Sequence, residues 1–153
     1  MGLPDASQPT GPLSYYAINV NSLAKPFAKE QFSADLMAYN IDIAIISESK
    51  LKKHHKDDFL AIPGYKLFRR DLVGRIGGGV VIYSRDFLKS TLCQISNDNR
   101  ELELLWVRSC TATETVITGA LYHQPKPCLQ TFSITSRDLW RRSWLVMMEP
   151  RLS

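Results

Sequence analysis

Short apolar runs rich in β-branched and aromatic residues alternate with polar turns along most of this sequence. Runs of this kind, bounded by Gly, Pro, Asn, Asp and Ser, predict β-strands. The predicted strands span residues 13–20, 41–47, 65–71, 80–85, 90–96, 101–110 and 114–122. The polar stretch "TATE" separates the last two runs, so we expect them to form a hairpin. Strands therefore dominate the chain from residue 41 onward.

A helix is predicted between the first two strands. Pro26 suits its first turn, where a missing N–H costs nothing, and Asn40 suits its end. The apolar residues between them recur at helical spacing and form one face: Ala28, Phe32, Leu36 and Tyr39. A strand, a helix and a second strand in this order predict a βαβ-like unit around a buried sheet. One further helical turn is expected near residues 57–60.

The two ends of the chain differ from the rest. Residues 1–13 are rich in Pro, Gly and Ser and predict a disordered leader, without the basic and apolar regions of a signal peptide. Residues 127–153 show no strand alternation, and their apolar spacing beside a cluster of arginines predicts a helix. No apolar stretch of the sequence approaches the roughly 20 residues that a membrane-spanning helix requires.

The composition, with 44% hydrophobic and 22% charged residues among 153, is typical of a globular protein. The net charge of +4 fits an anionic partner such as nucleic acid as well as it fits ordinary scatter of surface charge. The three cysteines lie far apart without a CxxC pair, which argues against a zinc site and a disulfide framework. These features indicate an intracellular protein, nuclear or cytoplasmic, that does not enter a membrane.

Glu48 follows a buried strand directly, in the stretch "IISESKL". A carboxylate at such a position is costly unless it binds a metal, a hydrogen-bond donor or a cation. The alternative, which the pattern alone favours slightly, is an exposed turn residue paired with Lys50 or Lys52. Asn19 and Asn21 end the first strand and offer either oxygen ligands or ordinary turn chemistry. Together with Glu48 they would suit Mg²⁺, which binds few protein oxygens.

Six segments of the chain, in a particular order, resemble a known family. They are INVNSL, IAIISESKL, IPGYKLFRRD, GRIGGGVVIYSR, ELLWVR and GALYHQP, within residues 14–126. The ordered set is similar to the endonuclease/exonuclease/phosphatase superfamily, specifically the apurinic-endonuclease-like domain of non-LTR retrotransposons. The resemblance implies an α/β (α+β) fold, the N-terminal portion of a four-layered α/β sandwich. It also implies Mg²⁺-dependent hydrolysis of DNA phosphodiester bonds without a small-molecule cofactor.

The resemblance implies roles for individual residues. Asn19 and Tyr122 match active-site residues that would orient the phosphate or metal-bound water. Glu48 matches the metal-binding glutamate, and Asn21 takes a position where a polar residue would join it. Three arginines around the glycine-rich hairpin would meet DNA phosphates: Arg69, Arg70 and Arg75.

The chain departs from the family pattern after Tyr122. The family's GDFN-like segment, which positions the attacking water, and its SDH-like segment, which contacts the phosphate, are absent from the sequence. Asp138 is the only aspartate after Tyr122, and no asparagine follows. The resemblance therefore covers a truncated, N-terminal half-domain, and residues 127–153 form an unrelated tail. We expect an endonuclease-like domain with little or no activity; the alternative is a non-catalytic remnant that binds nucleic acid or protein.

Overall fold

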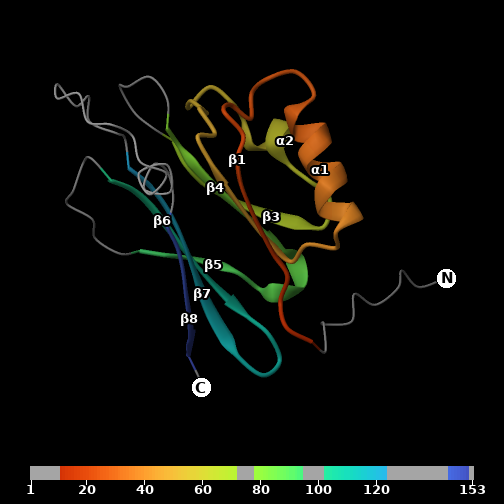
Figure 1. Ribbon diagram of the computed structural model, residues 1–153, viewed down its shortest axis with the longest axis vertical. Coiled ribbons are helices and arrows are strands. Elements are labelled where there is room, and N and C mark those ends of the chain that lie inside the picture. The colour runs from red at the N-terminus through yellow and green to blue at the C-terminus, as the bar shows by residue number, and fades with distance from the viewer. Residues whose placement is uncertain (1–10, 72–77, 95–101, 124–144, 152–153) are drawn as a thin grey trace, which may run out of the picture.

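Two four-stranded sheets and a few helices form the described part of the chain (Figure 1). The computed structural model describes residues 11–71, 78–94, 102–123 and 145–151. The helices are α1 (Ala28–Ala38), α2 (Asp57–Leu60) and the 3₁₀ turn η1 (Asp86–Leu88). The strands are β1 (Tyr15–Asn19), β2 (Ile43–Ser47), β3 (Tyr65–Arg70), β4 (Val80–Arg85), β5 (Thr91–Cys93), β6 (Leu102–Cys110), β7 (Thr115–His123) and β8 (Leu145–Arg151). The strands predicted from the hydrophobic pattern are confirmed as β1 to β7.

The first sheet has the strand order β1-β2-β4-β3. β1 and β2 run parallel, and Asn19 pairs with Ser47 at the end of their ladder. Parallel neighbours require a crossover connection, which α1 supplies, so the predicted βαβ-like unit is confirmed. β4 runs antiparallel to β2 and to β3, and places Val80 between Ser47 and Arg70.

α1 packs one side against the first sheet. Phe32 and Leu36 are buried there, as the helical spacing predicts. Tyr39 departs from the prediction because it lies at the C-terminal cap, where it is exposed and stacks on the ring of Tyr16. Asn40 then adopts φ 50°, the left-handed conformation that ends helices, as expected. Among the helices of the described ranges, none is long and apolar enough to cross a bilayer.

The second sheet has the order β5-β6-β7-β8, with antiparallel neighbours throughout. β6 and β7 form the predicted hairpin, which the N–H of Thr111 closes by donating to the Glu114 carbonyl at 2.9 Å. The Thr111 hydroxyl also accepts the N–H of Glu114, at 3.0 Å. A threonine that bonds its own turn explains how "TATE" reverses the chain without glycine.

The end of the chain does not form the predicted helix. β8, at Leu145–Arg151, runs antiparallel to β7 and completes the second sheet. The helix prediction is wrong for these residues, because pairing with the open edge of β7 outweighs a weak local preference. Residues 124–144, with the arginine cluster and Asp138, lie outside the described residues, as do residues 1–10. The domain boundary at residue 126 stays a prediction.

Two apolar clusters fill the space on the two sides of the first sheet. One joins α1 to residues that include Ala44 and Ile46. The other joins the opposite face, with Ile43 and Ile45, to the second sheet. The resulting layers are helix, sheet and sheet, as Figure 1 shows, which are layers expected of the α/β sandwich. Leu13, predicted to end the disordered leader, packs against the second cluster.

Asp42 interrupts the apolar run before β2 and is nevertheless buried. Its Oδ2 accepts the N–H of Ser14 at 2.8 Å and the Ser14 hydroxyl at 3.1 Å. The N–H of Asp42 donates in turn to the Ser14 hydroxyl, at 2.9 Å. This reciprocal pair satisfies Oδ2 of the carboxylate and joins the chain before β1 to the chain before β2.

We expect Asp42→Ala to lower the free energy of unfolding by about 1–3 kcal/mol, because it leaves the N–H of Ser14 without its acceptor. Asp42→Asn keeps one side-chain oxygen and should lose less. Urea denaturation followed by circular dichroism measures both variants. Equal stability of Asp42→Ala and the unsubstituted chain would contradict the role that we give to this pair.

Candidate active site

One edge of the first sheet gathers several of the predicted site residues. The registers pair Asn19 with Ser47, Ser47 with Val80, and Val80 with Arg70. Glu48 follows Ser47 directly at the same edge. Asn19, Glu48 and Arg70 are far apart in the sequence but share this edge, and we call the three residues the site edge.

Glu48 also reaches the second sheet. The Tyr122 hydroxyl, from β7, donates to Glu48 Oε1 at 3.3 Å, across 74 residues of sequence. Tyr122 is buried in the cluster between the sheets, and Glu48 is half-buried. Glu48 takes part in no ion pair within the described residues, so it is not an exposed carboxylate paired with Lys50 or Lys52. The structure therefore brings two predicted site residues together.

Glu48 and residues of the neighbouring turn adopt left-handed backbone conformations. Glu48 has φ 51° and Ser22 has φ 93°, conformations that cost free energy for residues other than glycine. The N–H of Ser22 donates to the Glu48 carbonyl at 2.8 Å, and that of Leu23 donates to the Ser49 carbonyl at 2.9 Å. These bonds join the turn after β1 to the turn after β2 and hold the strained backbone. Strain retained in this way is common at functional sites.

The glycine-rich stretch before β4 approaches the same turn closely. Gly79 has φ 88°, and its carbonyl accepts the N–H of Ser49 at 3.1 Å. The conformation favours glycine, and a Cβ added to Gly79 would also force the Ser49 hydroxyl to move. The rest of the predicted tight turn, residues 72–77, lies outside the described residues.

Asn19 ends β1 and Asn21 lies in the turn after it, and the two asparagines have different partners. Asn19 Oδ1 accepts the N–H of Asn21 at 3.1 Å, a bond typical of Asn in turns. Asn21 Oδ1 accepts a hydrogen bond from the Lys50 ammonium group. A protein cation therefore occupies the oxygen that was predicted to bind a metal. Sequence reasoning missed this role of Lys50 because it considered the lysine only as a partner for Glu48.

The oxygen atoms at the site edge fit a weakly held Mg²⁺ ion. Mg²⁺ binds through one or two carboxylates and keeps several waters. Glu48 offers a carboxylate. Asn19 Oδ1, at the end of the neighbouring strand, already accepts the N–H of Asn21 and keeps only one lone pair for a metal or its water. The buried Ser47 hydroxyl, directly before Glu48, has no hydrogen-bond partner in the part of the chain that is described, and a metal-bound water would satisfy it. Asn21 fits only if Lys50 moves away.

The site edge does not resemble a preformed metal cage. Across residues 11–71, 78–94, 102–123 and 145–151, no group of three or more His, Cys, Asp or Glu side chains is placed to hold a metal ion. Glu48 would therefore need water and phosphate oxygens to complete the coordination shell. Such a site gains most of its metal affinity when the phosphate is present.

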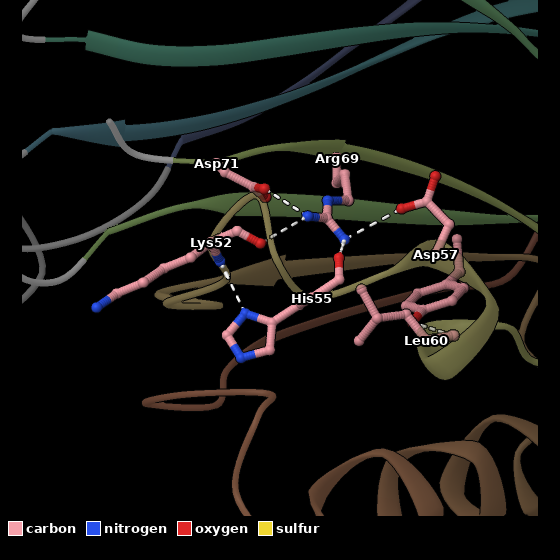
Figure 2. A network of polar contacts seen from close by, with 7 residues as sticks. Lys52, His55, Asp57, Leu60, Arg69 and Asp71 are labelled. Atoms are coloured by element: carbon pink, nitrogen blue, oxygen red, sulfur yellow. Dashed lines mark hydrogen bonds and ion pairs between the residues drawn. The ribbon is translucent and has the colours of Figure 1, made fainter. Parts of the chain in front are cut away.

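Arg69, predicted to meet DNA, is bound inside the protein (Figure 2). Its guanidinium donates to the carbonyls of Lys52 and His55, at 3.0 and 2.6 Å. It also donates to the carboxylates of Asp57 and Asp71, at 3.1 and 2.5 Å. The side chain is only 14% exposed, and these acceptors use both of its terminal nitrogens. The guanidinium therefore clamps the loop before α2 onto β3, a different role from the predicted phosphate contact.

Of the other two predicted phosphate-binding arginines, the structure describes only Arg70. Arg70 is exposed at the site edge, and its Nη1 donates to the Leu104 carbonyl of β6 at 2.9 Å. This bond provides a second link between the sheets, beside the one from Tyr122 to Glu48. Arg75 lies outside the described residues. Phosphate contacts of Arg70 and Arg75 stay predictions.

Comparison with solved structures identifies the fold. Humanized D. rerio TDP2 carrying 14 mutations is similar with a TM-score of 0.53 and 18% identity, over 75% of this chain and 49% of that one. This chain has part of the endonuclease/exonuclease/phosphatase fold. The AP endonuclease LMAP from Leishmania major has a TM-score of 0.48 and 14% identity, over 75% of this chain and 36% of that one. No protein-family model matches the chain, and no curated protein matches it either.

The comparison confirms the fold that the ordered segments predict. The chain spans about half the length of the TDP2 structure. An origin in a retrotransposon is a finer statement, and it stays a prediction.

We expect Arg69→Lys to release the loop before α2, because an ammonium group lacks the planar fork that reaches several acceptors at once. Amide hydrogen exchange should become faster at residues 52–57, while β2 and β4 keep their protection. The substitution keeps the net charge, so a change in overall charge would not explain the effect. Unchanged exchange in this loop would contradict the clamp.

Proposed function

We propose that this chain carries the metal-binding half of a Mg²⁺-dependent, DNA-cleaving phosphodiesterase site. We propose also that it derives from the endonuclease domain of a non-LTR retrotransposon. The fold supports the first proposal, and the ordered segments support both. The observation that carries the first is the bond from Tyr122 to Glu48, which joins the two sheets at the edge where Asn19 also lies.

The site residues would share the work of holding a phosphodiester. Glu48 would hold the cation, and the Tyr122 hydroxyl orients the Glu48 carboxylate from the second sheet. Asn19 would donate its amide N–H to a phosphate oxygen, because its Oδ1 already accepts the N–H of Asn21. Mg²⁺, when bound, would neutralise charge on the scissile phosphate and stabilise the leaving oxygen.

We propose further that these 153 residues alone bind DNA but hydrolyse it very slowly. Glu48, Asn19 and Tyr122 are all committed to the metal or the phosphate, so none of these three activates the attacking water. The GDFN-like and SDH-like segments that would do so are absent from the sequence. General acid–base catalysis alone contributes about 10²–10⁴-fold to such a reaction.

A plasmid-nicking assay with Mg²⁺ tests this proposal. We expect the chain to nick supercoiled DNA no faster than Glu48→Ala does, because the groups that activate water are missing. Glu48→Ala is the matched control, since it removes the one carboxylate of the site edge, and circular dichroism verifies that the variant is folded although it also loses the bond from Tyr122. Robust nicking that Glu48→Ala abolishes would overturn the proposed inactivity and would support Glu48 as the metal ligand.

Calorimetric titration with Mg²⁺ tests the metal site independently of hydrolysis. We expect Lys50→Gln to tighten Mg²⁺ binding several-fold, because it removes a competing cation and frees the Asn21 oxygen. Two unit charges 4 Å apart repel by about 1 kcal/mol in water, which sets the scale of the effect. Lys89→Gln removes the same charge from an exposed position after η1 and should change nothing. Weaker binding by Lys50→Gln would contradict the competition.

A further inference from the structure

A strongly basic loop begins two residues after Glu48. Residues 50–56 read KLKKHHK, with four lysines, two histidines and no acidic residue. Lys52, Lys53 and Lys56 are exposed, while Leu51 is buried in the first core cluster and anchors the loop. We call residues 50–56 the lysine loop. Neither the family resemblance nor the proposed metal site explains so much positive charge in one place.

The backbone of the lysine loop is held in one conformation. The N–H of His55 donates to the Lys52 carbonyl, and the N–H of Lys52 donates to His55 Nδ1, both at 2.9 Å. Burial of the ring, and then the neighbouring His54 and Arg69, lowers the pKa of His55, which favours the neutral ring that this bond needs. Arg69 binds the carbonyls of the same two residues from β3. The loop is therefore pre-organised by contacts that use its backbone.

The lysine side chains are not used by these contacts. Figure 2 shows the Lys52 side chain extending away from the network around Arg69. The ammonium groups of Lys52, Lys53 and Lys56 form no ion pair with any described residue. Asp57, the next residue along the chain, is paired with Arg69 at 3.1 Å. Asp58 follows and is exposed. The ammonium groups of Lys52, Lys53 and Lys56 therefore stay outside the ion pairs of the described residues, although a carboxylate lies at the end of the loop.

We propose that the lysine loop binds the phosphate backbone of DNA beside the site edge. The inference rests on the proposed function, because it takes DNA to be the ligand at that edge. Lysines contact phosphates as point charges and position a duplex without reading its sequence. A loop that is already ordered loses little conformational entropy when it binds, so each contact contributes more to affinity. Arg69 acts here as a positioning residue, through the two carbonyls that it clamps.

The test compares two double variants that remove the same charge. Lys53→Gln with Lys56→Gln acts on the lysine loop. Lys89→Gln with Arg108→Gln acts on exposed residues toward the other end of the two sheets. Fluorescence anisotropy measures binding of a labelled DNA duplex at several salt concentrations, with EDTA present. Because EDTA removes Mg²⁺, the result does not depend on metal binding or hydrolysis, and failure of the proposed catalytic site would not affect it.

We expect the loop variant to reduce the slope of log affinity against log salt concentration by about 0.9 for each phosphate that the loop no longer neutralises. The control variant should keep the slope of the unsubstituted chain. An equal reduction in both variants would overturn the proposal, because overall charge would then explain the binding. Absence of salt-dependent DNA binding would also overturn it, and so would tighter binding of polyglutamate, which would indicate an acidic protein partner.

Arg69→Lys separates positioning from charge. The net charge stays the same, so we expect weaker DNA binding only if the ordered loop matters. Circular dichroism verifies that each variant is folded before binding is measured. Unchanged affinity of Arg69→Lys would overturn the role of the clamp in DNA binding.

Discussion

The burial of β2 on both faces is the constraint on which the rest of this structure depends. All five residues of Ile43–Ser47 are buried. Ala44 and Ile46 face the cluster under α1, while Ile43 and Ile45 face the second sheet. Each fully buried isoleucine contributes roughly 1.5–3 kcal/mol. Since β1 and β4 also pair with β2 on its two sides, the end of this strand is firmly placed, and Glu48 begins from there.

Polar groups also link the first sheet to the second. The hydroxyls of Ser84, Ser90 and Ser109 form a buried chain between β4 and β6, with oxygen atoms 2.5 and 2.7 Å apart. Arg70 and Tyr122 make two more links at the site edge. Buried polar groups are costly unless they are satisfied, so these links favour one relative placement of the two sheets. A site built across both sheets needs that single placement.

Two features of the site edge bear on what it could bind: the strained backbone at Glu48 and the positive charge of the lysines beside it. Glu48 leaves the strand in a left-handed conformation, which the turn after β1 holds through the N–H of Ser22. Lys50, the first residue of the lysine loop, donates to Asn21, and the other lysines of the loop extend the positive charge along the surface. An anionic ligand with several phosphates would match this arrangement better than a single small anion would, because the charge extends over several residues.

The sequence by itself determined the elements that depend on local preference: strands β1 to β7, the helix between the first two strands, and the "TATE" hairpin. The ordered motifs also predicted the fold. Only the tertiary structure decided that Tyr122 contacts Glu48, that Arg69 is used internally, and that the last residues pair as β8. The sequence pattern around a strand arginine is identical whether its side chain contacts backbone carbonyls or a phosphate. Its partners come from a loop placed by the packing of layers, and a local pattern of residues carries no information on that packing.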